Sequence, residues 1–303
     1  MSISLKMEDD HPIGFLNLNK PAAMTSHAVV ARVRRSLGIK KLGHAGTLDP
    51  LATGVLVLCV GGATRLSEYV MESTKRYRAL LRLGVTTDTY DAEGTIVRQR
   101  DPSRVTRAQI ERALQQFIGP IEQVPPMYSA VKYNGRKLYE LARAGKTVER
   151  RPRPVTIYEL EVAHYVSPFL TLEVVCSPGT YIRSLAHDLG QALKVGASLA
   201  GLTRTASGMF TLENAVSLET LLSSENWREY LIAPAQALEA WDSIILDDDA
   251  LRAVRQGRAI ARHADQAAGL APLLAMAYDG EGVLVAVLRA AGDVWKPQKV
   301  FST

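Results

Sequence analysis

The sequence is poor in cysteine and in long apolar runs, and each absence excludes a class of protein. Only two cysteines, Cys59 and Cys176, occur in 303 residues. They are too few for a disulfide framework or a zinc cluster, and they are typical of a reducing cytoplasm. The longest apolar runs, near 54–63 and 283–288, fall far short of the roughly 20 residues that span a bilayer. The acidic opening MSISLKMEDDH lacks an apolar core, so we expect no secretory signal, no membrane association and a cytoplasmic protein.

Several catalytic motifs are also missing. The chain has no GxxxxGK[ST] phosphate loop, no GxGxxG dinucleotide turn, no HExxH and no His/Cys ligand spacing. It has no G-x-S-x-G elbow either, although a single sequence does not exclude Ser-His-Asp hydrolysis. The motifs that would indicate a bound nucleotide or a metal are therefore absent from the sequence.

The charge that is present is unevenly distributed. The net charge is only +5, but residues 1–153 hold 25 Lys and Arg against 14 Asp and Glu, whereas residues 154–303 hold 11 against 17. Arginine, whose planar fork suits phosphates and base edges, supplies 25 of the 36 basic residues. The asymmetry suggests that the first half faces a polyanion. A solvated basic surface without a ligand is the alternative.

The order of predicted elements indicates an α+β fold with a mixed or antiparallel sheet. Strand-like and helix-like segments do not alternate regularly enough for a doubly wound fold. Residues 39–54 are rich in Gly, Pro and small polar residues, and we expect them to form an irregular loop. Near residue 245 the chain changes character, which predicts a main domain over 1–245 and a small β-rich domain over 246–303.

Residues 124–153 differ from their surroundings and predict a basic lobe that projects from the main domain. Three tyrosines are interleaved with eight basic residues there, an arrangement suited to RNA. Asn134-Gly135 predicts a turn, and 137–144 a short helix. The residues expected to contact RNA are Lys132, Arg136, Lys137, Arg143, Arg150, Arg151 and Arg153.

Three residues elsewhere are candidates for chemistry, and each also has a plain structural interpretation. Asp49 is a lone carboxylate in a loop with Lys40, Lys41 and His44, but an Asp before Pro commonly caps a turn. Arg183 lies in the first turns of a predicted helix, where the helix dipole does not favour a cation, so an anionic partner is expected. The alternative is that its aliphatic stem simply packs over a neighbouring residue. Tyr77 is flanked by basic residues and could stack on a base, or pack in the core.

Taken together, four segments closely resemble the TruB family of tRNA pseudouridine synthases. They are HAGTLDPLATGVLVL (44–58), KRYR (75–78), PPMYSAVKYNGRKLYELAR (125–143) and CSPGTYIRSLAHDLG (176–190). The resemblance extends over almost the whole chain. It favours the catalytic interpretation of Asp49, Arg183 and Tyr77 over the structural one. It implies a pseudouridine synthase catalytic domain followed by a small PUA-like β-barrel, with residues 124–153 as an insertion that closes over the T arm of tRNA.

The resemblance also implies an activity and residue roles. Bacterial members isomerise uridine 55 in the T loop of tRNA by base flipping, without cofactor or metal. Asp49 matches the nucleophile, Arg183 its ion-pair partner that keeps it ionised, and Tyr77 the residue that stacks on the base and assists proton removal from C5. Among the remaining matches, His44 would replace the extruded nucleotide, and Tyr181 and Leu202 would line the uracil site. Lys20 belongs to a Lys-Pro segment that matches the substrate-binding part of the family, and it would support the active site. A monomer that acts on tRNA without an obligate protein partner is implied.

Two departures and two alternatives remain. Ala23 stands where the family often has Gly, and Pro178 stands where it commonly has Lys. We expect these two departures to alter the local backbone or the affinity without loss of activity. One alternative is a tRNA-folding chaperone whose role does not need the chemistry. The other is a synthase that depends on a guide RNA.

Overall fold

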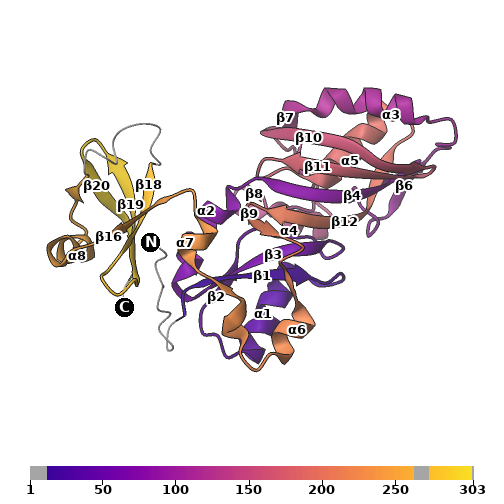
Figure 1. The fold of residues 1–303 in the computed structure, drawn as a ribbon. Helices are drawn as coiled ribbons and strands as arrows, with labels where there is room; N and C mark the ends of the chain where they lie inside the picture. The colour runs from indigo at the N-terminus through magenta and orange to yellow at the C-terminus, as the bar shows by residue number, and fades with distance from the viewer. Residues whose placement is uncertain (1–11, 263–272, 302–303) are drawn as a thin grey trace.

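A computed structural model describes residues 12–262 and 273–301. Its main feature is a curved mixed sheet, with a smaller sheet at the C-terminal end of the molecule (Figure 1). The fold class predicted from the sequence is confirmed. The main strand path, in sheet order, is β14 (Val216–Ser217), β1 (Gly14–Lys20), β3 (Thr53–Val60), β12 (Ala197–Ser207), β4 (Lys75–Leu83), β11 (Phe169–Cys176), β10 (Arg153–Val166) and β7 (Gly119–Gln123).

Most neighbours on this path are antiparallel, but β3 runs parallel to β12 and β1 to β14. Strand β4 lies near the centre, and its side chains alternate strictly between buried and exposed, as the period-2 pattern predicts. The strands that attach to the main path are β2 (Leu42–His44), β13 (Phe210–Thr211) and β15 (Leu231–Ile232). The presence of β2 corrects the expectation that 39–54 is wholly irregular, because β2 pairs with β3.

Helices cover the sheet in two groups, each with its own buried cluster. One cluster joins α3 (Arg107–Leu114) and α5 (Ile182–Ala192) to β4, β11 and β12. The other joins α1 (Ser26–Ser36) and α6 (Leu218–Ser223) to β1 and β3. The shorter helical segments are η1 (Gly61–Leu66), α2 (Ser67–Met71), η2 (Gln115–Phe117), η3 (Trp227–Tyr230) and α7 (Pro234–Ala237).

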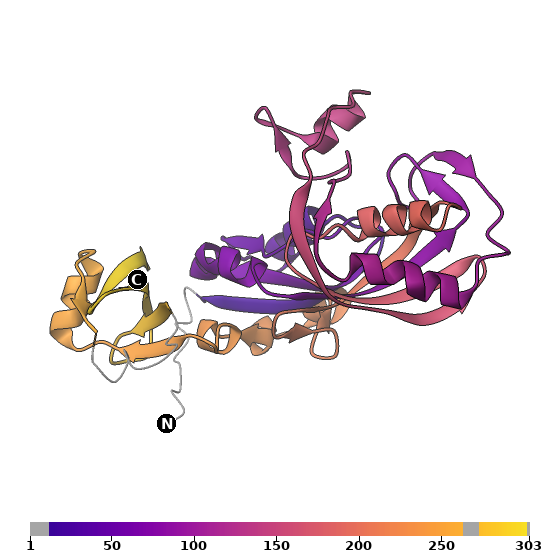
Figure 2. The same cartoon turned by 90° about the horizontal axis from the view of Figure 1, so that it is seen from above.

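The segment 124–153, which we call the basic lobe, projects away from the sheet (Figure 2). It contains β8 (Lys132–Tyr133), β9 (Arg136–Lys137) and α4 (Leu138–Arg143). Asn134 and Gly135 join the two strands with φ of 48° and 82°. Positive φ at both central residues is the geometry that Asn-Gly favours in a two-residue hairpin turn. A separate two-stranded ribbon, β5 (Val85–Thr87) with β6 (Ile96–Gln99), carries the loop 88–94.

The C-terminal sheet is a curled, PUA-like unit that packs against η1 and α2. Its strands, in sheet order, are β16 (Asp242–Ile245), β18 (Leu274–Tyr278), β19 (Leu284–Ala291), β20 (Val294–Val300) and β17 (Ile260–Ala261), with α8 (Asp248–Arg255) beside them. Phe301 lies under the Arg65 guanidinium, 5.1 Å from ring centroid to Cζ, and Lys299 forms an ion pair with Glu68. Strand β16 lies before the predicted boundary at 245 yet pairs in this sheet; the division into 1–245 and 246–303 stays a prediction.

Candidate active site

Asp49 lies in a short loop between β2 and β3 whose backbone is held on both sides. Ser26, at the first turn of α1, accepts a hydrogen bond from the Leu48 N–H at 2.8 Å and donates one to the Leu48 carbonyl at 3.1 Å. The Lys20 ammonium donates to the carbonyls of Pro21 (2.7 Å), Met24 (2.6 Å) and Pro50 (3.3 Å). The residue before Asp49 is thereby fixed to the start of α1, and the residue after it to the end of β1.

The other side of this loop rests on a close approach between β3 and β12. A Cβ on Gly54 would lie 2.2 Å from the Arg204 carbonyl oxygen, and Gly54 has a φ of +94°, so no other residue fits without rearrangement. The buried Arg204 guanidinium donates to the carbonyls of Val55 (2.7 Å) and Gly46 (3.2 Å). Arg204 therefore fixes both ends of the segment that carries Asp49.

Arg183 meets Asp49 through two parallel contacts, as the sequence led us to expect. Its Nε lies 2.9 Å from Asp49 Oδ2, and its Nη2 lies 3.1 Å from Oδ1. The Arg183 side chain is only 5% exposed, whereas that of Asp49 is 33% exposed. A fork-to-fork pair of this kind fixes the carboxylate in direction as well as in charge. The buried Arg183 guanidinium thus orients the Asp49 carboxylate, and part of that carboxylate still faces solvent.

Arg183 lowers the pKa of Asp49, as an ion-pair partner should, but it is not the largest influence on this carboxyl. Burial raises the pKa of Asp49 above its ordinary value, and this effect is larger than the lowering by Arg183. A second carboxylate, Asp91, raises the pKa of Asp49 further. The net direction is upward because burial outweighs the counter-charge of Arg183, and that guanidinium also faces Asp91.

Tyr77 and Leu202 are brought to the same place from neighbouring strands. Both pack in the cluster that contains Leu48 and Ala52, the residues on either side of the Asp49 turn. Burial raises the pKa of Tyr77, and the adjacent Arg204 partly opposes that rise. Asp49 adds a smaller upward influence to the pKa of Tyr77, and the phenol is therefore neutral at physiological pH.

The other predicted site residues lie on different elements. Tyr181 is the N-cap of α5, and Gln123 holds its backbone through hydrogen bonds of 2.7 and 3.0 Å. His44, on β2, is half-buried; burial, with smaller contributions from Arg204 and His27, lowers its pKa. Lys20 is fully buried and bonded to backbone, so it supports the Asp49 loop from below. Burial lowers the pKa of Lys20 to about 8, with Asp49 the main opposing influence.

The basic lobe presents most, but not all, of its predicted RNA contacts to solvent. Lys132, Arg136, Arg143, Arg151 and Arg153 are exposed. Lys137 is half-exposed, and its ammonium lies 5.5 Å from the Tyr139 ring centroid. Arg150 is half-buried and donates to the Pro125 carbonyl at 3.1 Å, so its guanidinium is partly engaged inside the protein.

Three groups at the site were not identified from the sequence. Asp91, 3% exposed, lies 3.4 Å from Arg183 Nη1, and the carbonyl of Tyr128 accepts from Arg183 Nη2 at 2.8 Å. The third is Arg204. The sequence feature that could have indicated Arg204 is a charged residue within a strand of small and apolar residues. The signal for Asp91 was weaker, since acids in a turn-rich loop are common. A backbone carbonyl leaves no signal at all.

A departure from the family pattern has a visible backbone consequence. Ala23, where the family often has Gly, adopts a φ of 59°. A left-handed conformation is open to glycine without strain but strains alanine. Pro178 lies in the turn before Tyr181, and Gly179 takes up the positive φ there.

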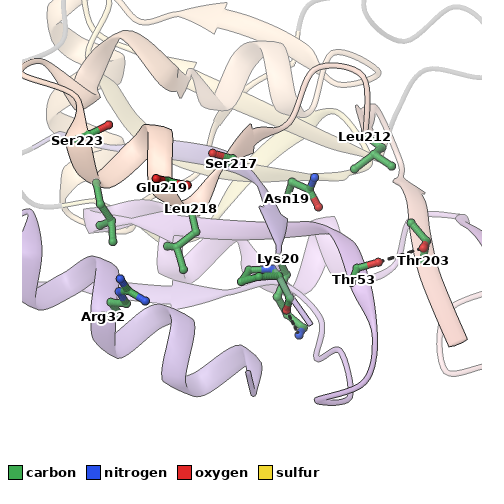
Figure 3. A pocket seen from close by; sticks show the side chains of 12 residues that line it. Asn19, Lys20, Arg32, Thr53, Thr203, Leu212, Ser217, Leu218, Glu219 and Ser223 are labelled. Carbon is green, nitrogen blue, oxygen red and sulfur yellow. Dashed lines mark hydrogen bonds between the residues drawn. The ribbon is translucent and has the colours of Figure 1, made fainter. Parts of the chain in front are cut away.

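A separate pocket lies between α1, α6 and the end of β1 and does not include Asp49, Tyr77 or Arg183 (Figure 3). Arg32 and Glu219 are the exposed charges of its lining, and the Thr53 and Thr203 hydroxyls, 3.0 Å apart, lie at one side. Lys20 also contributes to the lining, but its ammonium is bonded to carbonyls. Of the predicted site residues, only Lys20 contributes to this pocket.

Over 12–262 and 273–301, no group of three or more His, Cys, Asp or Glu side chains is arranged to hold a metal ion. No helix within those ranges is long and apolar enough to cross a membrane.

Family models match two consecutive parts of the chain. Residues 34–182 match the N-terminal domain of the TruB family pseudouridylate synthases, and residues 183–252 match the tRNA pseudouridylate synthase B C-terminal domain. The tRNA pseudouridine synthase B of Thiobacillus denitrificans is 46% identical over 292 residues, which cover 96% of each chain. That of Symbiobacterium thermophilum is 52% identical over 252 residues, covering 82% of this chain and 80% of the relative.

Solved structures with the same fold include chains of larger assemblies. An H/ACA RNP bound to a substrate RNA containing 2′-deoxyuridine contains a chain with a TM-score of 0.72 and 25% identity, covering 99% of this chain and 92% of that one. A chain of a Cbf5-Nop10-Gar1 complex has a TM-score of 0.71 and 28% identity, with the same coverage.

Proposed function

This chain belongs to the TruB family of pseudouridylate synthases, and we propose that it converts uridine 55 in the T loop of tRNA to pseudouridine, with Asp49 as the nucleophile. Pseudouridylation of tRNA follows from its relatives, which carry the name tRNA pseudouridine synthase B. The choice of uridine 55 and the roles of individual residues are the further steps of the proposal. The observation that carries the residue roles is the forked Arg183–Asp49 pair beside Tyr77. The choice of uridine 55 is carried over from the family to which the chain belongs.

The reaction is an isomerisation and needs no outside reagent. Uridine is extruded from the T loop because a stacked base hides the reacting atoms, and extrusion costs a few kcal/mol. Asp49 attacks the ribose or the base and forms a bond to it, and the N1–C1′ bond breaks. The uracil rotates, a C5–C1′ bond forms, and the bond to Asp49 breaks, which returns the free carboxylate. The proton on C5 leaves and N1 gains one, so substrate and product have the same atoms.

Each side chain around Asp49 suits one part of this sequence. Arg183 orients the Asp49 carboxylate and opposes the rise that burial causes in its pKa. Tyr77, neutral and flat, would stack on the uracil and assist removal of the C5 proton, with Arg204 beside it favouring the charged form. Leu202 and Tyr181 would flank the ring, and His44 would occupy the place of the extruded nucleotide.

The basic lobe would hold the T arm by its phosphates. Its exposed cations surround the tyrosines, and electrostatic contacts to phosphate give affinity without sequence preference. We propose that the chain works as a monomer on free tRNA without an obligate protein partner. Its two cysteines are free and buried, which supports a reducing, cytoplasmic setting.

The test is tritium release from tRNA labelled at uridine C5, with the purified chain alone. We expect one tritium released per tRNA, and background release when cytidine replaces uridine 55. Release from the cytidine-55 tRNA at the same rate would contradict the site of action. A chain that binds tRNA yet releases no tritium would leave only the chaperone alternative, and activity that needs an added RNA would favour a guided synthase.

A further inference from the structure

The loop 88–94 contacts α5 through two consecutive residues. The Tyr90 ring stacks on the ring of His187, with centroids 3.9 Å apart and planes 22° from parallel. The next residue, Asp91, reaches Arg183 Nη1 at 3.4 Å. Arg183 and His187 are four residues apart on α5, so they project from successive turns of one helix face. Neighbouring loop residues thus engage neighbouring turns of the helix that carries Arg183.

The backbone of this loop is not in a conformation that its sequence favours. Tyr90 has a φ of +67°, in the left-handed region that a bulky side chain rarely adopts. Such a conformation persists only when the surroundings determine it. Here the Tyr90 carbonyl accepts from the Leu199 N–H at 2.9 Å, and the ring stacks on His187.

The strained turn directs the Asp91 carboxylate. Asp91 Oδ1 accepts from the Thr89 hydroxyl (2.6 Å) and the Glu93 N–H (3.1 Å). Its Oδ2 is the atom that lies against Arg183. A change in the backbone at position 90 would therefore change the direction of this carboxylate.

His187 has no part in the proposed chemistry. Its Nδ1 is buried without a hydrogen-bond partner among the residues that the structure describes. Burial and the nearby Arg150 lower the pKa of His187, so the ring is neutral at physiological pH. The structure shows the His187 ring in contact with the face of the Tyr90 ring.

We propose that His187 is a positioning residue: its stack on Tyr90 holds the loop 88–94 in the conformation that sets Asp91 against Arg183, and thereby sets Arg183 against Asp49. The role rests on the proposed function of Asp49 and Arg183. It acts on the geometry of the reacting centre and not on tRNA binding.

The first test replaces His187 by Ala and by Phe and measures the single-turnover rate at saturating tRNA, the tRNA Kd and the Tm. We expect His187→Ala to slow the reaction by roughly ten- to a hundredfold, since small misplacements at a reacting centre have effects of that size. The Kd should stay within about twofold. His187→Phe, which keeps a flat ring but no imidazole, should restore most of the rate. Gln191→Ala, one turn further along α5 and exposed, is the matched control and should leave the rate unchanged.

The second test is a double-mutant cycle with Asp91→Asn. If His187 acts through Asp91, His187→Ala should slow the Asp91→Asn enzyme by less than about twofold, because interacting residues are not additive. Tyr90→Gly keeps the backbone conformation but removes the ring, so its single-turnover rate should equal that of His187→Ala. It provides the test if His187→Ala does not fold.

Three outcomes would overturn the role of His187 alone: a wild-type rate in both His187→Ala and Tyr90→Gly, full additivity with Asp91→Asn, or a rate that follows Tm across all variants. A wild-type chain that forms no pseudouridine would instead contradict the proposed function, and the positioning role with it.

Discussion

The chain places its charged side chains in two opposite settings, the centre around Asp49 and the basic lobe. At the centre, one guanidinium serves two carboxylates, and the side chains of Arg183 and Asp91 are each 5% exposed. In the lobe, five of the seven predicted RNA contacts are exposed. None of the lobe's basic side chains forms an ion pair within the part of the chain that the structure describes.

The difference shows how burial changes the cost of altering one charge. A buried charge that loses its partner is left uncompensated, whereas an exposed charge is screened by water and salt. Single changes at the centre should therefore alter the chemistry by orders of magnitude. Changes in the lobe should alter binding by modest, salt-dependent factors.

Asp49→Asn should have the largest effect. Loss of the nucleophile should reduce the single-turnover rate at least about a thousandfold, while tRNA binding stays within a few-fold. Tritium release and a filter-binding assay separate the two. Turnover at the wild-type rate would contradict the assignment of Asp49; tRNA folding that persists without turnover would mean that the chain also acts as a chaperone.

Arg183→Met should come next. Removing the shared cation should slow the reaction about a hundredfold or more and lower the free energy of unfolding by about 3 kcal/mol, because two carboxylates lose their counter-charge. The protonated form of Asp49 cannot attack, so the rate falls as pH drops through the pKa of Asp49. Without Arg183 that pKa rises further, and the fall should begin at a higher pH. An unchanged acid limb in the pH–rate profile would contradict this.

The lobe should respond far less. The triple variant Lys132→Ala/Arg136→Ala/Arg151→Ala should weaken binding equally for all tRNA sequences and reduce the salt slope by about 0.7–0.9 for each phosphate that is no longer neutralised. The single-turnover rate at saturating tRNA should stay near wild type. A salt slope equal to that of the wild type would refute phosphate binding by these side chains.

Arg78→Ala should have the smallest effect. Arg78 follows Tyr77 on β4, points to the opposite face and pairs with Glu173 while 63% exposed. An exposed pair of this kind contributes about 0–1 kcal/mol, so Tm and turnover should barely change. A loss of activity comparable with that of a Tyr77 variant would show that the two faces of β4 are not independent.

Local patterns in the sequence predicted the fold well where one face of an element is buried. The alternation of apolar and polar residues over 77–83 indicates a strand with one inward face. Thr25, a preferred N-cap residue before a stretch with apolar periodicity, indicates the start of α1, where its hydroxyl accepts from the Ala28 N–H at 3.0 Å. The strand β2 was missed because three residues of intermediate burial have no periodicity of their own. Its pairing is determined by β3, which lies elsewhere in the chain.

At the site, the sequence identified the residues better than their electrostatics. Asp49 and Arg183 are 134 residues apart, and only the resemblance to a family placed them together. Asp91 was not identified, and this second acid contributes to the upward direction of the Asp49 pKa. A pKa depends on every charge and on the burial around a group, neither of which a motif contains.

The hydrogen bonds from Ser26 and Lys20 on either side of Asp49 have a consequence for timing. Because they connect the loop to the first turn of α1 and the end of β1, the loop becomes ordered when the chain folds, before any RNA arrives. The entropy lost in fixing this stretch of backbone is thus incurred once in the lifetime of the protein and is not repeated in each catalytic cycle.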